Sequence, residues 1–189
     1  MMDLVEKVVI LHHALVAADV PHAFGGALAL AYCTLDPRGT SDIDCNLFVA
    51  ADHPEAGLDA LPPGVEVPAG TATTVGRDGQ VRLWWEGTPL DLFFDYADVH
   101  AQAARRRRVV DFAGVALPVL GCTDLVLFKA FFDRTKDWAD IEAVVVAGTL
   151  DVEEAHGALS TLLGPDDHRV LRLAGLTGAG RPTGRPPRG

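Results

Sequence analysis

The sequence has few cysteines, and they form no pattern that would hold a metal. Cys33, Cys45 and Cys122 are odd in number, widely spaced and set among apolar residues, with no Cys-x-x-Cys pair. Zinc sites usually draw on closely spaced cysteine pairs, and disulfides are rare in the reducing cytosol. We therefore expect three buried free thiols in a cytoplasmic protein.

Long apolar runs and a secretory leader are also lacking. No apolar stretch approaches the roughly 18 residues that a membrane-spanning helix needs. The segment from Met1 to Leu15 carries Asp3, Glu6 and Lys7 among its apolar residues, which is typical of an amphipathic helix and not of a signal peptide. These features predict a soluble protein with no membrane partner.

Positive charge is scarce as well. The formal net charge is −10, with 26 acidic against 16 basic residues. A protein that binds nucleic acid over a broad surface is usually basic, because neutralising phosphates supplies much of the affinity. The composition therefore disfavours a large nucleic-acid footprint and leaves room for a local one, at Arg105–Arg108 or in the tail with Arg181, Arg185 and Arg188.

The length and the apolar patterns predict one globular unit with two parts. A chain of 189 residues can bury about 70% of its unfolded surface. Residues 1–120 are predicted to form an α/β (α+β) core, a mixed β-sheet flanked by helices, and residues 121–176 a small helical C-terminal part. The Gly-, Pro- and Arg-rich residues 177–189 are expected to be disordered.

Periodicity and turn residues place the individual elements. Helices are predicted over residues 2–18, 27–33, 53–61, 98–107, 124–134, 137–147, 152–163 and 166–174, with Thr123 and Asp137 as caps. Strands are predicted over 42–49, 81–85, 90–94, 109–112 and 115–119. Residues 62–79 are rich in turn residues and are expected to hold at most a short strand over 65–67.

Asp42 and Asp44 are the first candidate site residues. They lie two apart in a predicted strand, so their side chains project from the same face. Two carboxylates placed side by side repel each other unless a cation compensates them. Hard oxygen ligands without a nearby His or Cys cluster favour Mg²⁺ or Mn²⁺ over zinc. Taken alone, an Asp-x-Asp pair is more often a solvated strand face.

Two further features add to this pair. Gly25-Gly26 begins a predicted helix, where backbone N–H groups and the helix dipole favour a phosphate; the alternative is a glycine turn chosen for close packing. Asp91 and Asp95 share one face of the apolar strand 90–94. A charge in such a strand needs a partner, and one of the two would meet the Asp42/Asp44 pair if the strands are neighbours.

Together these residues resemble the polymerase-β-like nucleotidyltransferase superfamily. Its signature is a Gly-Gly or Gly-Ser pair, an Asp-x-Asp strand and a distant third Asp, here Gly25-Gly26, Asp42-Ile43-Asp44 and Leu90-Asp91-Leu92. The resemblance is strongest to the AbiEii-like toxin branch, through Arg38-Gly39-Thr40-Ser41 before the aspartates, Lys129 on a later helix, and Lys136-Asp137 followed by Asp140 on the next.

The resemblance implies two-metal transfer of a nucleotidyl group from a nucleoside triphosphate to an acceptor hydroxyl. Asp42, Asp44 and Asp91 would hold Mg²⁺ or Mn²⁺, and Lys129 would contact the triphosphate, the alternative being a surface lysine with a snorkelling stem. Asp140 would orient Lys129 or lie beside the nucleotide. The nucleotide-binding residues would be Gly25, Gly26, Arg38, Ser41, Lys129 and Asp140.

The acceptor is less well defined than the chemistry. The AbiEii-like form favours a toxin that modifies tRNA or other RNA and is restrained by a cognate antitoxin. The alternatives are transfer to a protein or to a small molecule such as an aminoglycoside, and a non-catalytic member that only binds nucleotide. Arg105–Arg108 would contact the RNA or form an ordinary charged helix face. Trp84 and Trp85 alternate, so one of them could stack on a base.

Overall fold

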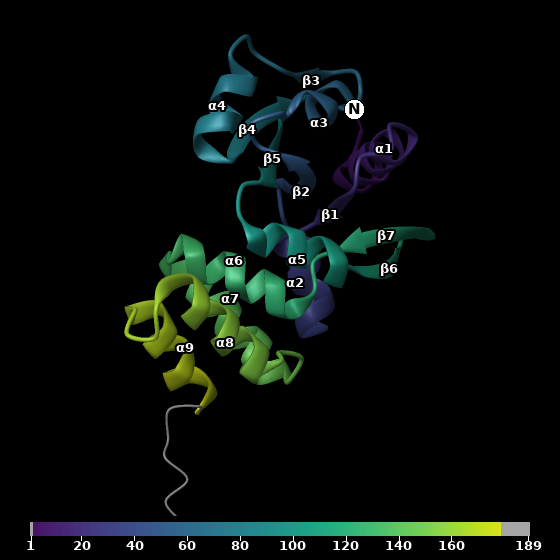
Figure 1. Ribbon diagram of the computed structural model, residues 1–189. Helices are drawn as coiled ribbons and strands as arrows, with labels where there is room; N and C mark the ends of the chain where they lie inside the picture. Colours follow the sequence, from purple (N-terminus) through teal and green to yellow (C-terminus); the bar gives the residue numbers. More distant parts are fainter. Residues whose placement is uncertain (1, 179–189) are drawn as a thin grey trace, which may run out of the picture.

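A single mixed sheet with helices around it organises residues 2–178, the part of the chain that this computed structural model describes (Figure 1). Along the chain, the elements are α1 (Leu4–Ala17), β1 (His22–Phe24), α2 (Gly26–Thr34), β2 (Ile43–Ala50), α3 (Glu55–Asp59), β3 (Val65–Glu66), α4 (Thr71–Asp78), β4 (Gln80–Trp85), β5 (Thr88–Asp95), α5 (Asp98–Arg106), β6 (Arg108–Phe112), β7 (Val115–Val119), α6 (Cys122–Phe132), α7 (Thr135–Ala147), α8 (Val152–Leu163) and α9 (His168–Thr177).

The strands lie in the order β3-β4-β5-β2-β1-β7-β6. β2 pairs with β5 and β1 pairs with β7 in parallel, while β1–β2, β3–β4, β4–β5 and β6–β7 are antiparallel. The predicted fold class, a mixed α/β sheet with flanking helices, is confirmed. The sheet makes β2 and β5 neighbours, although 47 residues separate Asp44 from its partner Asp91.

Alternation along β5 separates the core from the site. Leu90, Leu92 and Phe94 are fully buried on one face of the strand, while Asp91 and Asp95 lie on the other. Side chains two apart in a strand share a face, so a slip of one residue would bury the carboxylates and expose the leucines. The apolar face therefore fixes where the acidic face lies.

Helices α6 to α9 gather at one end of the molecule, in green to yellow in Figure 1. α6 packs against α2, α7 and α8, and nearly all of its residues are buried. The buried apolar residues of the sheet and of these helices belong to one continuous cluster. The last strand ends at Val119, and only helices follow in the described residues. The division of the chain into two parts at residue 120 stays a prediction.

Two elements were not predicted from the sequence. β1 has only three residues, and His22, Ala23 and Phe24 are all buried, so it shows no alternation that would mark a strand. The imidazole of His22 lies 2.9 Å from that of His12 and 2.8 Å from the carbonyl oxygen of Val20, which satisfies its buried nitrogens. α4 lies in the segment predicted as turns; Gly70 and Gly79, both with positive φ, bound this short helix.

Both predicted caps were wrong in position. α6 begins at Cys122 with Gly121 as its N-cap, so Thr123 is already inside the helix. α7 begins at Thr135 after Arg134, which places Asp137 in its first turn. There Asp137 is 1% exposed and binds Arg134 and Lys129, so side-chain pairing and not capping accounts for it.

The prediction of three free thiols was wrong for two cysteines. Cys33, at the end of α2, forms a disulfide with Cys122, the first residue of α6, with 5.5 Å between their Cα atoms. The two are separated by 89 residues, so no local spacing pattern reveals the pair. Cys45 is the free thiol among the described residues, and burial raises its pKa. Because disulfides are rare in the cytosol, a cytoplasmic location stays a prediction.

None of the helices in residues 2–178 has the length and hydropathy that crossing a bilayer requires. The predicted disorder of residues 177–189 falls outside the described residues, except that Thr177 ends α9 and Gly178 caps it.

The disulfide predicts how many cysteines react with a thiol reagent. Alkylation of the unfolded, unreduced protein should modify Cys45 alone, because only its sulfur is free. Alkylation after reduction should modify all three, and mass spectrometry distinguishes the two products. Three modified cysteines without any reductant would contradict the Cys33–Cys122 bond.

Candidate active site

Three aspartates lie on or next to the neighbouring strands β2 and β5. In the parallel register Asp44 lies opposite Asp91, and neighbouring strands are about 5 Å apart. Asp42 directly precedes β2. The pKa of Asp44 is raised to about 6, chiefly by burial and then by the charges of Asp42 and Asp91, while Lys129 and Lys136 act in the opposite direction. The three carboxylates therefore act on one another electrostatically.

The strand register also shows which of Asp91 and Asp95, the two aspartates on this face of β5, lies beside Asp44. Asp95 lies opposite Ala50, at the far end of β2 from Asp44. Its carbonyl oxygen accepts the backbone N–H of Ala51 at 2.9 Å. Asp91 is thus the carboxylate of β5 that the fold places beside the Asp42/Asp44 pair.

Gly26 lets the start of α2 approach Asp44 closely. Its φ is +51°, and a Cβ at this position would lie 1.8 Å from Oδ2 of Asp44. The N–H of Gly25 donates to the carbonyl oxygen of Asp44 at 2.9 Å, which joins the N-terminus of α2 to β2. The close packing considered from sequence is therefore present, and it brings the positive end of the helix dipole to the carboxylates.

Two of the carboxylates already have polar partners. Asp91 accepts two hydrogen bonds from the guanidinium of Arg82, at 2.7 and 2.6 Å. Asp42 accepts a hydrogen bond from the hydroxyl of Thr40 at 2.5 Å. Within residues 2–178, no three His, Cys, Asp or Glu side chains are drawn together as a ready-made metal site. Ser41 is exposed next to Asp42.

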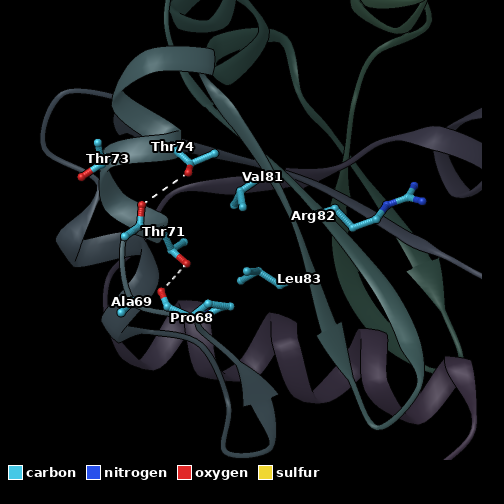
Figure 2. Close-up of a pocket in the computed structure, with 9 residues that line it drawn as sticks. Pro68, Ala69, Thr71, Thr73, Thr74, Val81, Arg82 and Leu83 are labelled. Atoms are coloured by element: carbon cyan, nitrogen blue, oxygen red, sulfur yellow. Dashed lines mark hydrogen bonds between the residues drawn. The ribbon is translucent and has the colours of Figure 1, made fainter.

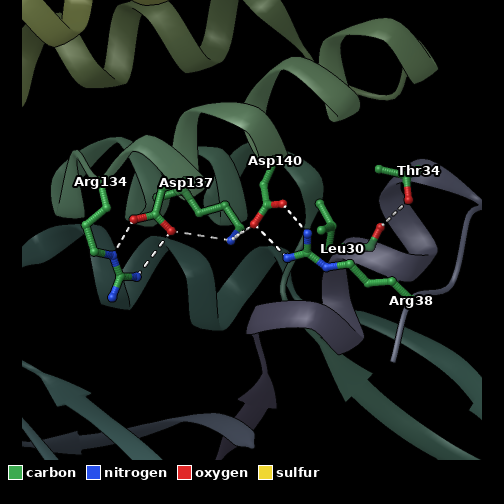
Figure 3. Close-up of polar contacts among 7 residues, drawn as sticks. Leu30, Thr34, Arg38, Arg134, Asp137 and Asp140 are labelled. Atoms are coloured by element: carbon green, nitrogen blue, oxygen red, sulfur yellow. Dashed lines mark hydrogen bonds and ion pairs between the residues drawn. The ribbon is translucent and has the colours of Figure 1, made fainter. Parts of the chain in front are cut away.

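A chain of ion pairs lies across α6 and α7 (Figure 3). The Nζ of Lys129 donates to Oδ2 of Asp140 at 2.6 Å and lies 3.7 Å from Oδ1 of Asp137. Arg38, from the loop before β2, binds Asp140 at 2.7 Å, and Arg134 binds Asp137. In Figure 3 the two arginines approach the two aspartates from opposite ends.

This chain shows that Lys129 is not a surface lysine. Its side chain is 11% exposed, and the aspartates that bind it are 1% and 5% exposed. Asp137 and Asp140 are three residues apart in α7 and so share the face that meets α6. The structure brings Arg38, Lys129 and Asp140 together, and the charge of Lys129 partly offsets the raised pKa of Asp44.

Sequence reasoning gave no site role to three basic residues near the carboxylates. Arg82 faces Asp91 across the β4–β5 hairpin, and the short turn at Glu86-Gly87 could have revealed this pairing. The hydrogen bond to Asp137 chiefly raises the pKa of Arg134, and the charges of Asp44 and Asp91 add to this; Lys136 lowers the pKa of Asp44. Arg134 and Lys136 come shortly after α6 and are far from β2 in the sequence. Their sequence positions therefore do not predict that they lie near β2.

Within the basic segment Arg105–Arg108, Arg106 forms ion pairs inside the protein, and the other three arginines are exposed. Arg106 binds Asp124, which is 1% exposed, at 2.5 Å, and it also pairs with Glu154. Arg107 donates to the carbonyl oxygen of Ala104 at 2.8 Å. Arg106 is therefore a structural contact between α5 and the helices α6 and α8. Trp85 is 1% exposed, whereas Trp84 is 47% exposed.

Replacing Gly26 tests the close approach of α2 to Asp44. Gly26→Ala should lower the free energy of unfolding by about 1–3 kcal/mol, because the left-handed φ is strained and the new Cβ displaces the carboxylate. The matched control is Gly39→Ala, where a Cβ meets no heavy atom within 4 Å. Denaturant unfolding measures both, and equal stability of the two variants would contradict this packing.

Comparison with known proteins shows similarity at the level of the fold. No protein-family model matches the chain, and no curated protein sequence matches it. The solved structure of the antibiotic-resistance factor ANT(2'')-Ia is similar over 93% of this chain and 89% of that one, with 16% identity and a TM-score of 0.53. A nucleotidyltransferase-like antigenic protein of Paracoccidioides brasiliensis (18% identity, 88% of this chain and 89% of that one, TM-score 0.49) and a proposed nucleotidyltransferase of H. pylori (16%, 93% and 92%, 0.47) also match. The chain has a nucleotidyltransferase-like fold.

Proposed function

We propose that this protein is a metal-dependent nucleotidyltransferase, which moves a nucleoside monophosphate from a triphosphate to an acceptor hydroxyl. The observation that supports it most is the pairing of Asp44 with Asp91 across β2 and β5, with Asp42 alongside. A fold alone does not define a reaction, so the proposal depends on these side chains.

The donor set fits Mg²⁺ or Mn²⁺. Asp42, Asp44 and Asp91 offer only carboxylate oxygens, which these hard cations prefer. The raised pKa of Asp44 reflects its burial and, next, repulsion from Asp42 and Asp91, and a divalent cation at this position would relieve that repulsion. When bound, the metal would stabilise charge on the attacking and leaving oxygens.

The chain's own residues would bind and orient the triphosphate. The phosphates would lie at the N-terminus of α2, near Gly25, Gly26 and Ser41. Lys129 and Arg38 would contribute positive charge and would exchange part of their bonding to Asp140 for phosphate oxygens. Asp140 would keep Lys129 in place, so it is a positioning residue.

The reaction is a substitution at the α-phosphorus. The acceptor oxygen forms a bond to phosphorus, the bond from phosphorus to the bridging oxygen breaks, and pyrophosphate leaves with the electron pair. The hydroxyl proton passes to one of the site carboxylates and then to water. Catalysis in this arrangement comes chiefly from positioning and electrostatic stabilisation.

For the acceptor, we favour a small molecule over RNA. RNA binding depends on basic groups that neutralise phosphates, and Arg106, at the centre of the densest basic segment, is bound to Asp124 and Glu154. An RNA acceptor, a toxin role and a cognate antitoxin stay predictions that follow from the AbiEii-like resemblance. We propose a small-molecule hydroxyl as the acceptor.

Calorimetry tests the metal site. The protein should bind Mg²⁺ together with a nucleoside triphosphate, and the double variant Asp42→Asn, Asp44→Asn should lose this joint binding because amides carry no charge to attract the cation. The control replaces two exposed aspartates outside the site, Asp36→Asn with Asp52→Asn. Unchanged Mg²⁺–NTP affinity in the first double variant would remove the metal from the proposal.

Asp91 and Asp95 can be compared in the same strand. Asp91→Ala should lower the transfer rate at least 100-fold, about 2.7 kcal/mol of transition-state stabilisation, because this carboxylate lies opposite Asp44. Asp95→Ala should retain most activity. The rate is followed as pyrophosphate release, and the reverse ranking would assign the role to Asp95.

The basic segment tests whether the acceptor is RNA. The double variant Arg105→Ala, Arg107→Ala spares Arg106 and so keeps its pairing with Asp124. With a small-molecule acceptor, nucleotide transfer from labelled triphosphate in a cell extract should be unchanged. Label that appears on RNA and falls in this variant, with a shallow dependence on salt, would instead support the RNA acceptor.

A further inference from the structure

A largely apolar cavity of about 580 Å³ opens beside Asp42 and Asp44. Its walls come from the first turns of α1, from α2, from the loop before β2, and from β6; they include Leu4, Val8, Leu28, Leu35 and Phe112. Small-molecule sites usually have volumes of about 300–1,000 Å³ and mostly apolar walls with a few polar groups. The cavity has the size and composition of such a site.

Most polar side chains in its wall are already hydrogen-bonded. The hydroxyl of Tyr32 donates to the carbonyl oxygen of Asp111 at 2.5 Å, and that of Thr40 to Asp42. Arg38 is the one basic side chain among the described lining residues, and it is paired with Asp140. The carboxylates at one end are therefore the main polar feature that a ligand would meet.

Of the basic residues near the carboxylates, Arg38 lines the cavity, whereas Lys129, Arg134 and Lys136 do not. Lys129 belongs to α6, Arg134 to the turn after it and Lys136 to α7. No described residue of α6 or α7 lines the cavity. A triphosphate needs those cations, so the α6–α7 side suits the nucleotide. The apolar side, against α1 and β6, is left for the second substrate.

A second cavity, of about 440 Å³, has no comparable relation to the site. It lies at the edge of the sheet, between α4 and β4, with Thr71, Thr74 and Ala69 in its wall. Figure 2 shows the guanidinium of Arg82, which binds Asp91, directed away from these threonines. It serves as the reference cavity in the experiment below.

We infer that the cavity beside Asp42 and Asp44 is the acceptor site and that the acceptor is a small, uncharged aromatic or alicyclic alcohol. Its apolar body would lie against Leu28 and Leu35, and its hydroxyl would reach the carboxylates. An anionic acceptor would be repelled by Asp42 and Asp44, and a strongly hydrated one would lose water to apolar walls. This inference rests on the proposed function, since it assigns the second substrate of the same reaction.

The reaction at this site balances with a nucleoside triphosphate as the other substrate. The alcohol oxygen forms the new bond to the α-phosphorus and gives up its proton, while the bond to the pyrophosphate oxygen breaks. The products are a phosphodiester between the alcohol and the nucleoside, and pyrophosphate. The linkage forms without any oxidant or reductant.

Binding of 2-naphthol, an uncharged fluorescent aromatic alcohol, tests the inference without turnover. Its fluorescence is titrated with the full-length protein in the absence of triphosphate, and 2-naphthoate serves as an anionic probe of similar size. We expect saturable binding of 2-naphthol and at least tenfold weaker binding of 2-naphthoate. Failure to bind 2-naphthol, or equal binding of the two probes, would overturn the inference.

Two variants locate the binding. Ala31→Trp fills the cavity from α2, and Leu35→Asn removes an apolar wall at a residue that is 82% exposed. Leu35 has a φ of +57°, which asparagine adopts readily, so this variant keeps the fold even if Ala31→Trp does not. Each should weaken 2-naphthol binding at least tenfold. The matched control, Ala69→Trp in the reference cavity, should bind as the parent does.

The outcomes also separate this inference from the proposed function. Unchanged 2-naphthol affinity in both Leu35→Asn and Ala31→Trp overturns the acceptor cavity, whatever the protein does with Mg²⁺ and triphosphate. Loss of affinity in these variants, together with label transfer from α-labelled triphosphate to 2-naphthol, supports both. Loss of affinity with no Mg²⁺–triphosphate binding supports an apolar alcohol site and contradicts the nucleotidyltransferase proposal.

Discussion

Repulsion between carboxylates on adjacent parallel strands governs the candidate site. The register of β2 and β5 places Asp44 opposite Asp91, and the buried Leu90, Leu92 and Phe94 on the other face hold that register. The strands cannot slip to relieve the repulsion without exposing these side chains. Compensation must come from outside the strands, and it comes from Arg82, from Lys129 and from the start of α2.

The C-terminal helices bring much of that compensation to the sheet. Lys129 is held by Asp140 and Asp137, and Arg38 ties the same network to the loop before β2. Removing one partner of a buried ion pair typically costs 3–5 kcal/mol, because a buried charge is left alone. The disulfide from Cys33 to Cys122 joins α2 to α6 at the opposite end of α2 from Gly26. The charged network ties α6 to α7 and to the loop before β2, and the covalent bond ties α6 to α2, so both hold α6 in place.

Sequence patterns predicted most helices and strands and the strand face that carries Asp91. They failed where contacts between residues far apart in the sequence determine the structure. The alternation in Leu90–Phe94 predicted both a strand and the face that carries Asp91. β1 was missed because its residues are buried on both faces, and α4 because its glycines and threonines resemble a turn. The Cys33–Cys122 bond and the pairing of Arg38 with Asp140 depend on tertiary proximity, which a single sequence does not encode in local spacing.

The central claim is that the facing carboxylates direct attack on the α-phosphorus of a nucleoside triphosphate. The most direct measurement incubates the protein and Mg²⁺ with a small-molecule cell extract and each triphosphate, labelled at either the α- or the γ-phosphorus. The account predicts α-label in a new organic product and γ-label in pyrophosphate, with both absent when Asp44 is replaced by Asn. Label from the γ-phosphorus in the organic product, or in free phosphate alone, would contradict it.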